Sequence, residues 1–217
     1  MIEPGSLCAY SKAMSKITDY PFYKTAMDWL EQFISKPHPD LGREGIVCPF
    51  VPISIRKDLV TFGVMRTQKN SQEEAVEKML PLIRLFLDLE PSSGANKLLK
   101  SLIIFFPDVR SDEAYDFIDV GHSILKRSFV DHGLMIGEFH SLSRQLGYHN
   151  KNFYPMVSPM PAFVIRHMSA HDIKFLNIPE VSIEDRRHFL ESYLKFMGDT
   201  LSADHLKKVR EIVADLC

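Results

Sequence analysis

"LLKSLIIFFPD", residues 98–108, has the strongest pattern of a buried β-strand in this chain. Its apolar run, residues 102–106, has no polar interruption and is closed by Pro107. This pattern is typical of a strand with both faces covered. Three further segments have strand patterns: residues 59–65, "GLMIGEF" at 133–139 and "PAFVIRHM" at 161–168. The chain is therefore built around a sheet.

Helical patterns alternate with these strands and then continue alone to the C-terminus. A helix is expected after Pro21, a second from Ser71 with Glu74 completing a capping box, and a third capped by Ser111. Pro81 should kink or break the second helix. Three closing helices have expected N-caps at Ser169, Ser182 and Ser202, and Asp172 and Asp185 complete capping boxes in the first two.

This order predicts the α+β class: a single domain with a mixed β-sheet flanked by helices and a helical C-terminal segment. We expect the domain to span residues 19–217. Residues 1–18 show little periodicity and are expected to be a partly mobile N-terminal segment. The C-terminal helices are a candidate cover for one face of the sheet.

Composition excludes several classes of protein. The 217 residues are 45% hydrophobic and 25% charged, with a net charge of −2 and no basic run, so nucleic acid is not an expected partner. No apolar stretch approaches the roughly 18 residues of a membrane helix. Cys8, Cys48 and Cys217 form no disulfide pattern, which favours the cytoplasm.

Histidines and one carboxylate are the candidate site residues. Six of the nine histidines lie within fifty residues: His122, His132, His140, His149, His167 and His171. Glu138 and His140 are two apart on one expected strand, so they should face the same side, and Glu138 needs a partner such as Arg166 or a histidine. His140 and His167 would share a site if their strands were neighbours ending at one sheet edge. Structural ion pairs and capping are the alternative interpretation for each residue.

Two other residues have chemistry to consider. Arg166 at a strand end could clamp a carboxylate or phosphate, or form a surface salt bridge. Cys48 precedes a proline, as some haem-ligating thiolates do, although a buried inert cysteine is the commoner outcome.

Several stretches carry a resemblance to a known family. These are "HPDLGREGIVCPFV", "SLIIFFPD", "HGLMIGEFH", "GYHNKNFYPM" and "SPMPAFVIRHM", and they look like a family of uncharacterised bacterial proteins with one domain of unknown function. The resemblance runs from about residue 20 to residue 176. Members are often encoded near natural-product biosynthesis genes, which implies specialised metabolism.

A second, fainter resemblance is to the YqcI/YcgG proteins, some of which are haem-dependent N-oxygenases acting on arginine. Cys48-Pro49-Phe50 matches their loop motif, Phe105-Phe106 their paired aromatic strand, and His122 falls near their helix histidine. The chain lacks their Trp-rich segment and their late arginine-rich stretch.

The leading hypothesis is therefore a haem-dependent oxygenase acting on a small nitrogen-containing substrate. It makes His122 or His167 the iron ligand, Arg166 or Cys48 a further cofactor contact, and Glu138 and His140 the proton-handling residues. Two alternatives remain: a non-catalytic accessory protein that binds a small molecule, and a cofactor-free acid–base enzyme using Glu138 and His140. The sequence leaves the substrate and the oligomeric state open.

Overall fold

The computed structural model describes residues 1–216 and contains one mixed sheet with the strand order β1-β2-β3-β5-β4. The strands are β1 Cys8–Ala9, β2 Val60–Val64, β3 Ser101–Phe105, β4 Leu134–Phe139 and β5 Ala162–His167. β2 and β3 are parallel, whereas β5 runs antiparallel to both of its neighbours, β3 and β4. The C-terminal ends of β2, β3 and β4 therefore lie at the same end of the sheet, where β5 begins.

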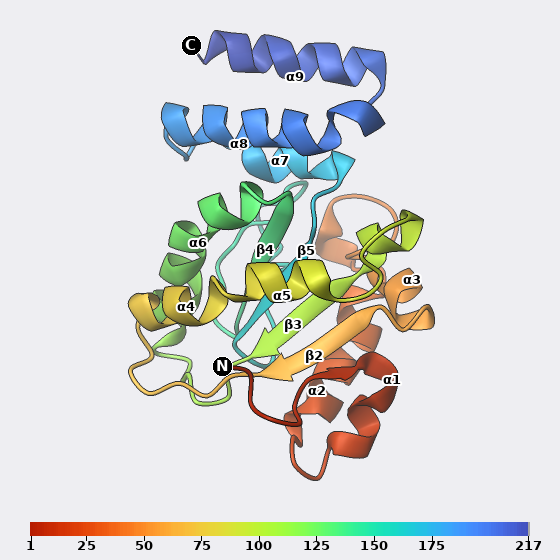
Figure 1. Ribbon diagram of the computed structural model, residues 1–217, viewed down its shortest axis with the longest axis vertical. Coiled ribbons are helices and arrows are strands. Elements are labelled where there is room, and N and C mark those ends of the chain that lie inside the picture. Colours follow the sequence, from red (N-terminus) through yellow and green to blue (C-terminus); the bar gives the residue numbers. More distant parts are fainter. Residues whose placement is uncertain (217) are drawn as a thin grey trace.

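Helices lie against the two faces of the sheet, and the C-terminal helices lie beyond one of its ends (Figure 1). The helices are α1 Tyr10–Ala13, α2 Phe22–Trp29, α3 Val51–Arg56, α4 Gln72–Met79, α5 Leu82–Asp88, α6 Gly121–Val130, α7 Ile173–Leu176, α8 Ile183–Met197 and α9 Ala203–Asp215. Two π-helices, η2 Leu30–Ile34 and η5 Tyr115–Val120, continue into or out of α-helices. The predicted α+β class, the mixed sheet and the helical C-terminus are confirmed.

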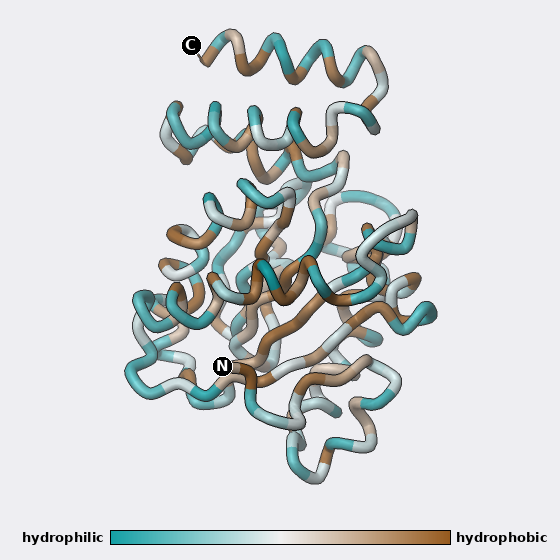
Figure 2. The backbone as a smooth tube through the Cα atoms, viewed as in Figure 1, coloured by the Kyte–Doolittle hydropathy of each residue, from teal (hydrophilic) through white to brown (hydrophobic). Residues whose placement is uncertain are grey.

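Each face of the sheet has its own core. Alternate strand residues such as Leu102, Ile104 and Ile136 pack against α4, α5 and α6, while Ile103 and Phe105 pack against α2 and η2. Figure 2 shows the result: hydrophobic residues are concentrated in the strands, and hydrophilic residues recur along the outer helices. The continuous apolar run of β3 exists because both of its faces are buried.

Capping side chains bound several helices as expected. Ser71, Ser182 and Ser202 each accept a hydrogen bond from the backbone N–H three residues later, and Ser169 forms a complete capping box with Asp172. The prediction for Ser111 is wrong. Its hydroxyl contacts Ser141 at 3.3 Å, because this helical segment opens later, in the π-helical geometry of η5.

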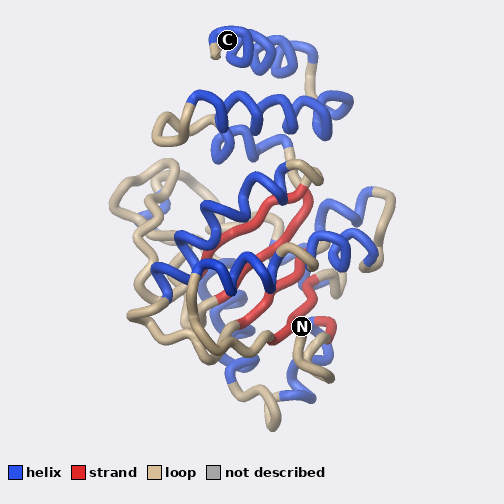
Figure 3. Tube along the Cα trace, turned by 60° about the vertical axis from the view of Figure 1, so that its left-hand side comes forward, coloured by secondary structure: helices blue, strands red, loops and turns tan. Residues whose placement is uncertain are grey.

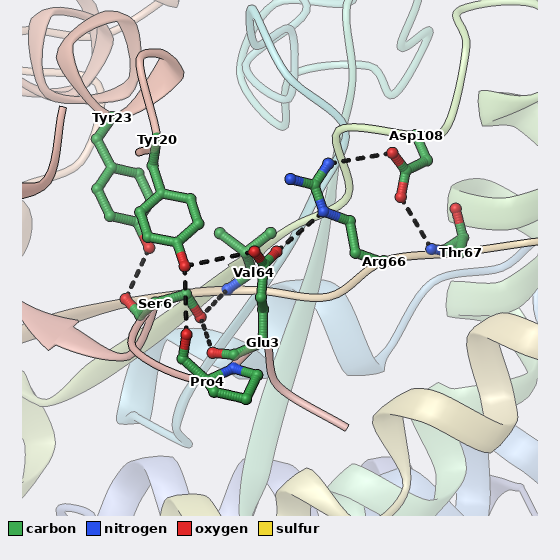
Figure 4. Close-up of polar contacts among 9 residues, drawn as sticks. All are labelled: Glu3, Pro4, Ser6, Tyr20, Tyr23, Val64, Arg66, Thr67 and Asp108. Carbon is green, nitrogen blue, oxygen red and sulfur yellow. Dashed lines mark hydrogen bonds and ion pairs between the residues drawn. The ribbon is translucent and has the colours of Figure 1, made fainter. Parts of the chain in front are cut away.

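The N-terminal segment is joined to the sheet in this structure, and the partial mobility expected for residues 1–18 stays a prediction. β1 pairs antiparallel with β2, which adds an edge strand that periodicity over two residues cannot reveal. Before it, the backbone N–H of Glu3 donates to the carbonyl of Val64 at 2.8 Å, and Ser6 accepts from the N–H of Val64 (Figure 4). Arg66 joins the carboxylates of Glu3 and Asp108 at 2.9 and 3.2 Å.

The C-terminal helices take a different position from the expected one over a sheet face. They stack beyond the end of the sheet, with α8 on α7 and α9 outermost, as the two views show (Figures 1 and 3). Their core includes Phe189, Leu190 and Tyr193 of α8, and it reaches the sheet through Met135 and Met168. The third core therefore extends the molecule instead of covering a face. None of the helices in the described residues has the length and apolar character needed to span a membrane.

Candidate functional site

Two carboxylate–histidine pairs lie side by side between β4 and the helical segment formed by η5 and α6. Strand geometry places Glu138 and His140 in the same row as Leu134 and Ile136, which faces α6. The expectation that the two polar residues face one side is therefore confirmed.

The first pair joins Glu138 to His122, one of the predicted partner types. Nε2 of His122 lies 3.2 Å from Oε2 of Glu138 and 3.1 Å from the carbonyl oxygen of Ile136. A carbonyl can only accept a hydrogen bond, so Nε2 carries the proton and Nδ1 of neutral His122 keeps its lone pair. Both side chains are largely buried, at 8% and 13% exposure.

The second pair joins His140 to Asp119, with Nε2 of His140 at 2.8 Å from Oδ2 of Asp119. The imidazole is fully enclosed, and its Nδ1 has no hydrogen-bond partner among the described residues. A carboxylate that accepts from one ring nitrogen fixes the tautomer and stabilises the charged form of the ring. Asp119, the most open of the four side chains, comes from η5.

A cation completes this group of residues. Lys126, one turn after His122 on α6, donates to the carbonyl of Phe175 at 2.8 Å and interacts electrostatically with Glu138. Burial lowers the pKa of Lys126, and the charge of Glu138 acts in the opposite direction. The site therefore contains two carboxylates, two imidazoles and one partly buried ammonium group.

Asp119 and Lys126 were missed by the sequence reasoning. Asp119 and His122 are three residues apart, a spacing that places two side chains on one face of a regular helix. The sequence contains no signal for the π-helical geometry of η5, a geometry that is rare and is frequent at functional sites.

The predicted shared site of His140 and His167 is wrong. Their strands are neighbours, as the prediction required, but they are antiparallel: Phe139 pairs with Ala162 and Leu134 with His167. His140 therefore lies at one end of the sheet and His167 at the other. A strand pattern carries no information on the direction of its neighbour, so this could not be predicted.

Arg166 lies at the His167 end, where Asp172 holds it. Its Nη1 and Nη2 lie 2.7 and 2.5 Å from the two carboxylate oxygens of Asp172, a side chain that is 1% exposed. The guanidinium thus has an internal bidentate partner, which corresponds to the salt-bridge alternative. Asp172 also accepts from the backbone of Ser169, so the pair fixes the turn after β5.

The expected haem ligands do not form one cofactor site. Nε2 of His122 is occupied by protein groups, His167 is at the far end of the sheet, and the half-buried Cys48 packs in the core of the opposite face. No group of three or more His, Cys, Asp or Glu side chains in residues 1–216 is arranged to hold a metal ion. These positions do not fit haem, and haem dependence stays a prediction.

Comparisons with known proteins give a family and no activity. The profile of a family described as domain of unknown function (DUF6875) matches residues 23–208. A search of curated proteins found no match. A search of solved structures found none either. The match covers most of the chain, including all five site residues, and the chain therefore belongs to the DUF6875 family of domains of unknown function.

Proposed function

We propose that this protein is an acid–base enzyme that transfers a proton to and from a small-molecule substrate at the edge where β4 ends. The observation that carries the proposal is the enclosed Glu138 carboxylate 3.2 Å from Nε2 of His122. Of the three hypotheses from the sequence, the cofactor-free acid–base enzyme has the most support. Its two residues, Glu138 and His140, each form a carboxylate–imidazole pair. Natural-product biosynthesis is the metabolic setting that we propose for this reaction.

His122 is assigned the role of general base. Its Nε2–H is committed to Ile136 and Glu138, so a substrate proton would be taken up at Nδ1. Glu138 orients the ring and would stabilise the imidazolium that forms, as the carboxylate does in other histidine–carboxylate pairs. Glu138 is thus a positioning residue, which differs from the direct proton-handling role expected for it.

Asp119 and His140 are assigned the complementary proton transfer. Asp119 is the accessible member, and its carboxylate shares a hydrogen bond with Nε2 of His140. Two neighbouring pairs allow one to remove a proton while the other returns one, which is the arrangement needed for isomerisation or elimination reactions. The small substrate would approach from the Asp119 side, since His140 is enclosed.

The first test is the protonation pattern of His122, read from its ring ¹⁵N chemical shifts by NMR at neutral pH. The proposal requires the Nε2–H tautomer in the wild type, because the carbonyl of Ile136 and the carboxylate of Glu138 both face Nε2. A wild-type ring protonated at Nδ1 alone would contradict the assignment, since the base would then have no lone pair at that atom.

The second test measures activity without knowing the substrate. A panel of small aldehydes, ketones and imines in D₂O is followed by ¹H NMR for enzyme-catalysed deuterium incorporation. We expect exchange with wild type and a loss of about 10²-fold or more in His122→Gln, the usual contribution of a general base. His132→Gln, an exposed histidine outside the site, is the matched control. Equal rates for wild type and His122→Gln throughout the panel would make the pairs structural.

A further inference from the structure

A hollow lies at the opposite end of the sheet from the acid–base site. Its volume is about 560 Å³, and its walls come from α5, the segment before β3, the turn between α6 and β4, the end of β5 and the end of α8. The residues that define it are Leu87, Lys97, Leu98, His167, Lys195 and Phe196. The hollow therefore forms where α5, the sheet and α8 meet.

The charge of this hollow is positive. Lys97 and Lys195 line it, and neither forms an ion pair with any residue that the structure describes. The one carboxylate in the lining, Asp131, is occupied by Nε2 of His188 at 2.5 Å. Two cations without carboxylate partners, beside an acid that already has one, favour an anionic ligand.

A buried imidazole with an unused nitrogen adds a polar group. His167 is only 6% exposed, its ring packs on Phe86 at 5.1 Å between centroids, and its Nε2 has no hydrogen-bond partner in residues 1–216. A buried polar atom without a partner costs about 1–3 kcal/mol. The imidazole therefore adds a polar group to the wall of the hollow, although its Nε2 atom is itself enclosed.

The remaining walls are apolar. Leu87, Leu98 and Phe196 line the hollow, and Leu98 and Phe196 expose 46% and 39% of their surface. Phe196 is held in place because it packs directly on Gly133, where an added Cβ would lie 2.7 Å from its ring. The hollow thus combines an apolar wall with a cationic rim.

We propose that this hollow binds a small monocarboxylate with an apolar tail. The carboxylate would accept hydrogen bonds from Lys97 and Lys195 beside the His167 ring, and the tail would cover Leu87, Leu98 and Phe196. Small-molecule sites commonly have this composition, mostly apolar walls with a few convergent polar groups. This site is separate from the acid–base pairs, which lie at the other ends of β4 and β5.

Octanoate is the probe that tests the proposal, titrated below its micelle concentration and followed by amide ¹H–¹⁵N NMR. We expect saturable shifts centred on Lys97, Gly133 and Met168. The double variant Lys97→Gln/Lys195→Gln should bind octanoate about tenfold more weakly, as expected for the loss of two solvent-accessible ion pairs. Lys208→Gln, an exposed lysine on α9, should bind as the wild type does.

Two comparisons decide the outcome: octanoate against octan-1-ol, and wild type against the double variant. Octan-1-ol has the same tail without the charge, so it should bind more weakly and be insensitive to the double substitution. Unsaturable shifts, shifts outside the hollow, or equal octanoate affinity in wild type and double variant would each overturn the proposal. His122→Gln should leave octanoate binding unchanged, so failure here is distinct from failure of the acid–base proposal.

Discussion

Asp119 shows how much one carboxylate contributes at the residue scale. It is the only hydrogen-bond partner that the described residues offer to the ring of His140, whose other nitrogen has none. Asp119→Ala would leave both ring nitrogens of an enclosed imidazole unpartnered. We expect the free energy of unfolding to fall by about 1–3 kcal/mol, measured by urea denaturation at pH 7. Asp19→Ala, at an exposed carboxylate without a hydrogen-bond partner among the described residues, should cost less, and an equal loss would contradict the role of Asp119.

His167 makes stability depend on pH. Burial, together with Lys97 and Lys100, lowers its pKa from the usual 6.5 to about 4. Between these two values the unfolded chain binds a proton that the folded chain does not, so stability falls as the pH decreases through this window. The shift corresponds to about 2–3 kcal/mol, present in full near pH 7 and lost by about pH 4.

The measurement for His167 is urea denaturation at several pH values between 4 and 7. His167→Gln keeps a polar side chain of similar length but cannot titrate, so its stability should change less over this range by the same 2–3 kcal/mol. Parallel curves for wild type and variant would show that His167 is not the group responsible.

At the scale of single elements, residue chemistry predicted several helix boundaries. Ser71, Ser182 and Ser202 cap the helices that the sequence assigned to them, and Pro81 separates α4 from α5. Local signals suffice there because a cap acts on its own backbone. The π-helix η5 was not predictable, since π-geometry depends on packing against neighbouring elements. As a result, His140 was identified from the sequence but its partner Asp119 was not.

The turn between α6 and β4 depends on one glycine. Gly133 has φ of +69°, and a Cβ there would lie 2.7 Å from the ring of Phe196. Gly133→Ala should therefore lower the free energy of unfolding by about 2–4 kcal/mol, from backbone strain together with the steric overlap. Gly5→Ala is the matched control, because Gly5 also has positive φ but nothing within 4 Å of its Cβ position. Similar losses in both variants would mean that the contact with Phe196 adds nothing.

At the scale of the whole molecule, strand order was the feature that the sequence did not reveal. All four predicted strands exist. However, β5, the last strand in the sequence, lies between β3 and β4 and runs antiparallel to both. That pairing joins segments separated by long connections, and period-2 patterns are the same for either direction. It separates His140 from His167 and creates two candidate sites, one at each end of the sheet, where the sequence had suggested one.

The layered arrangement also predicts how the molecule opens. β3 and β5 are central in the sheet, with Leu102, Ile104, Phe163 and Ile165 fully or almost fully enclosed, whereas α9 is the outermost layer and packs mainly on α8. In native-state hydrogen exchange, amides of β3 and β5 should therefore exchange only through global unfolding. Amides of α9 should exchange through a smaller opening with lower free energy and weaker dependence on denaturant, because less surface is exposed. If α9 and β3 gave the same opening free energy and the same denaturant dependence, the C-terminal helices and the sheet would form one cooperative unit instead of two.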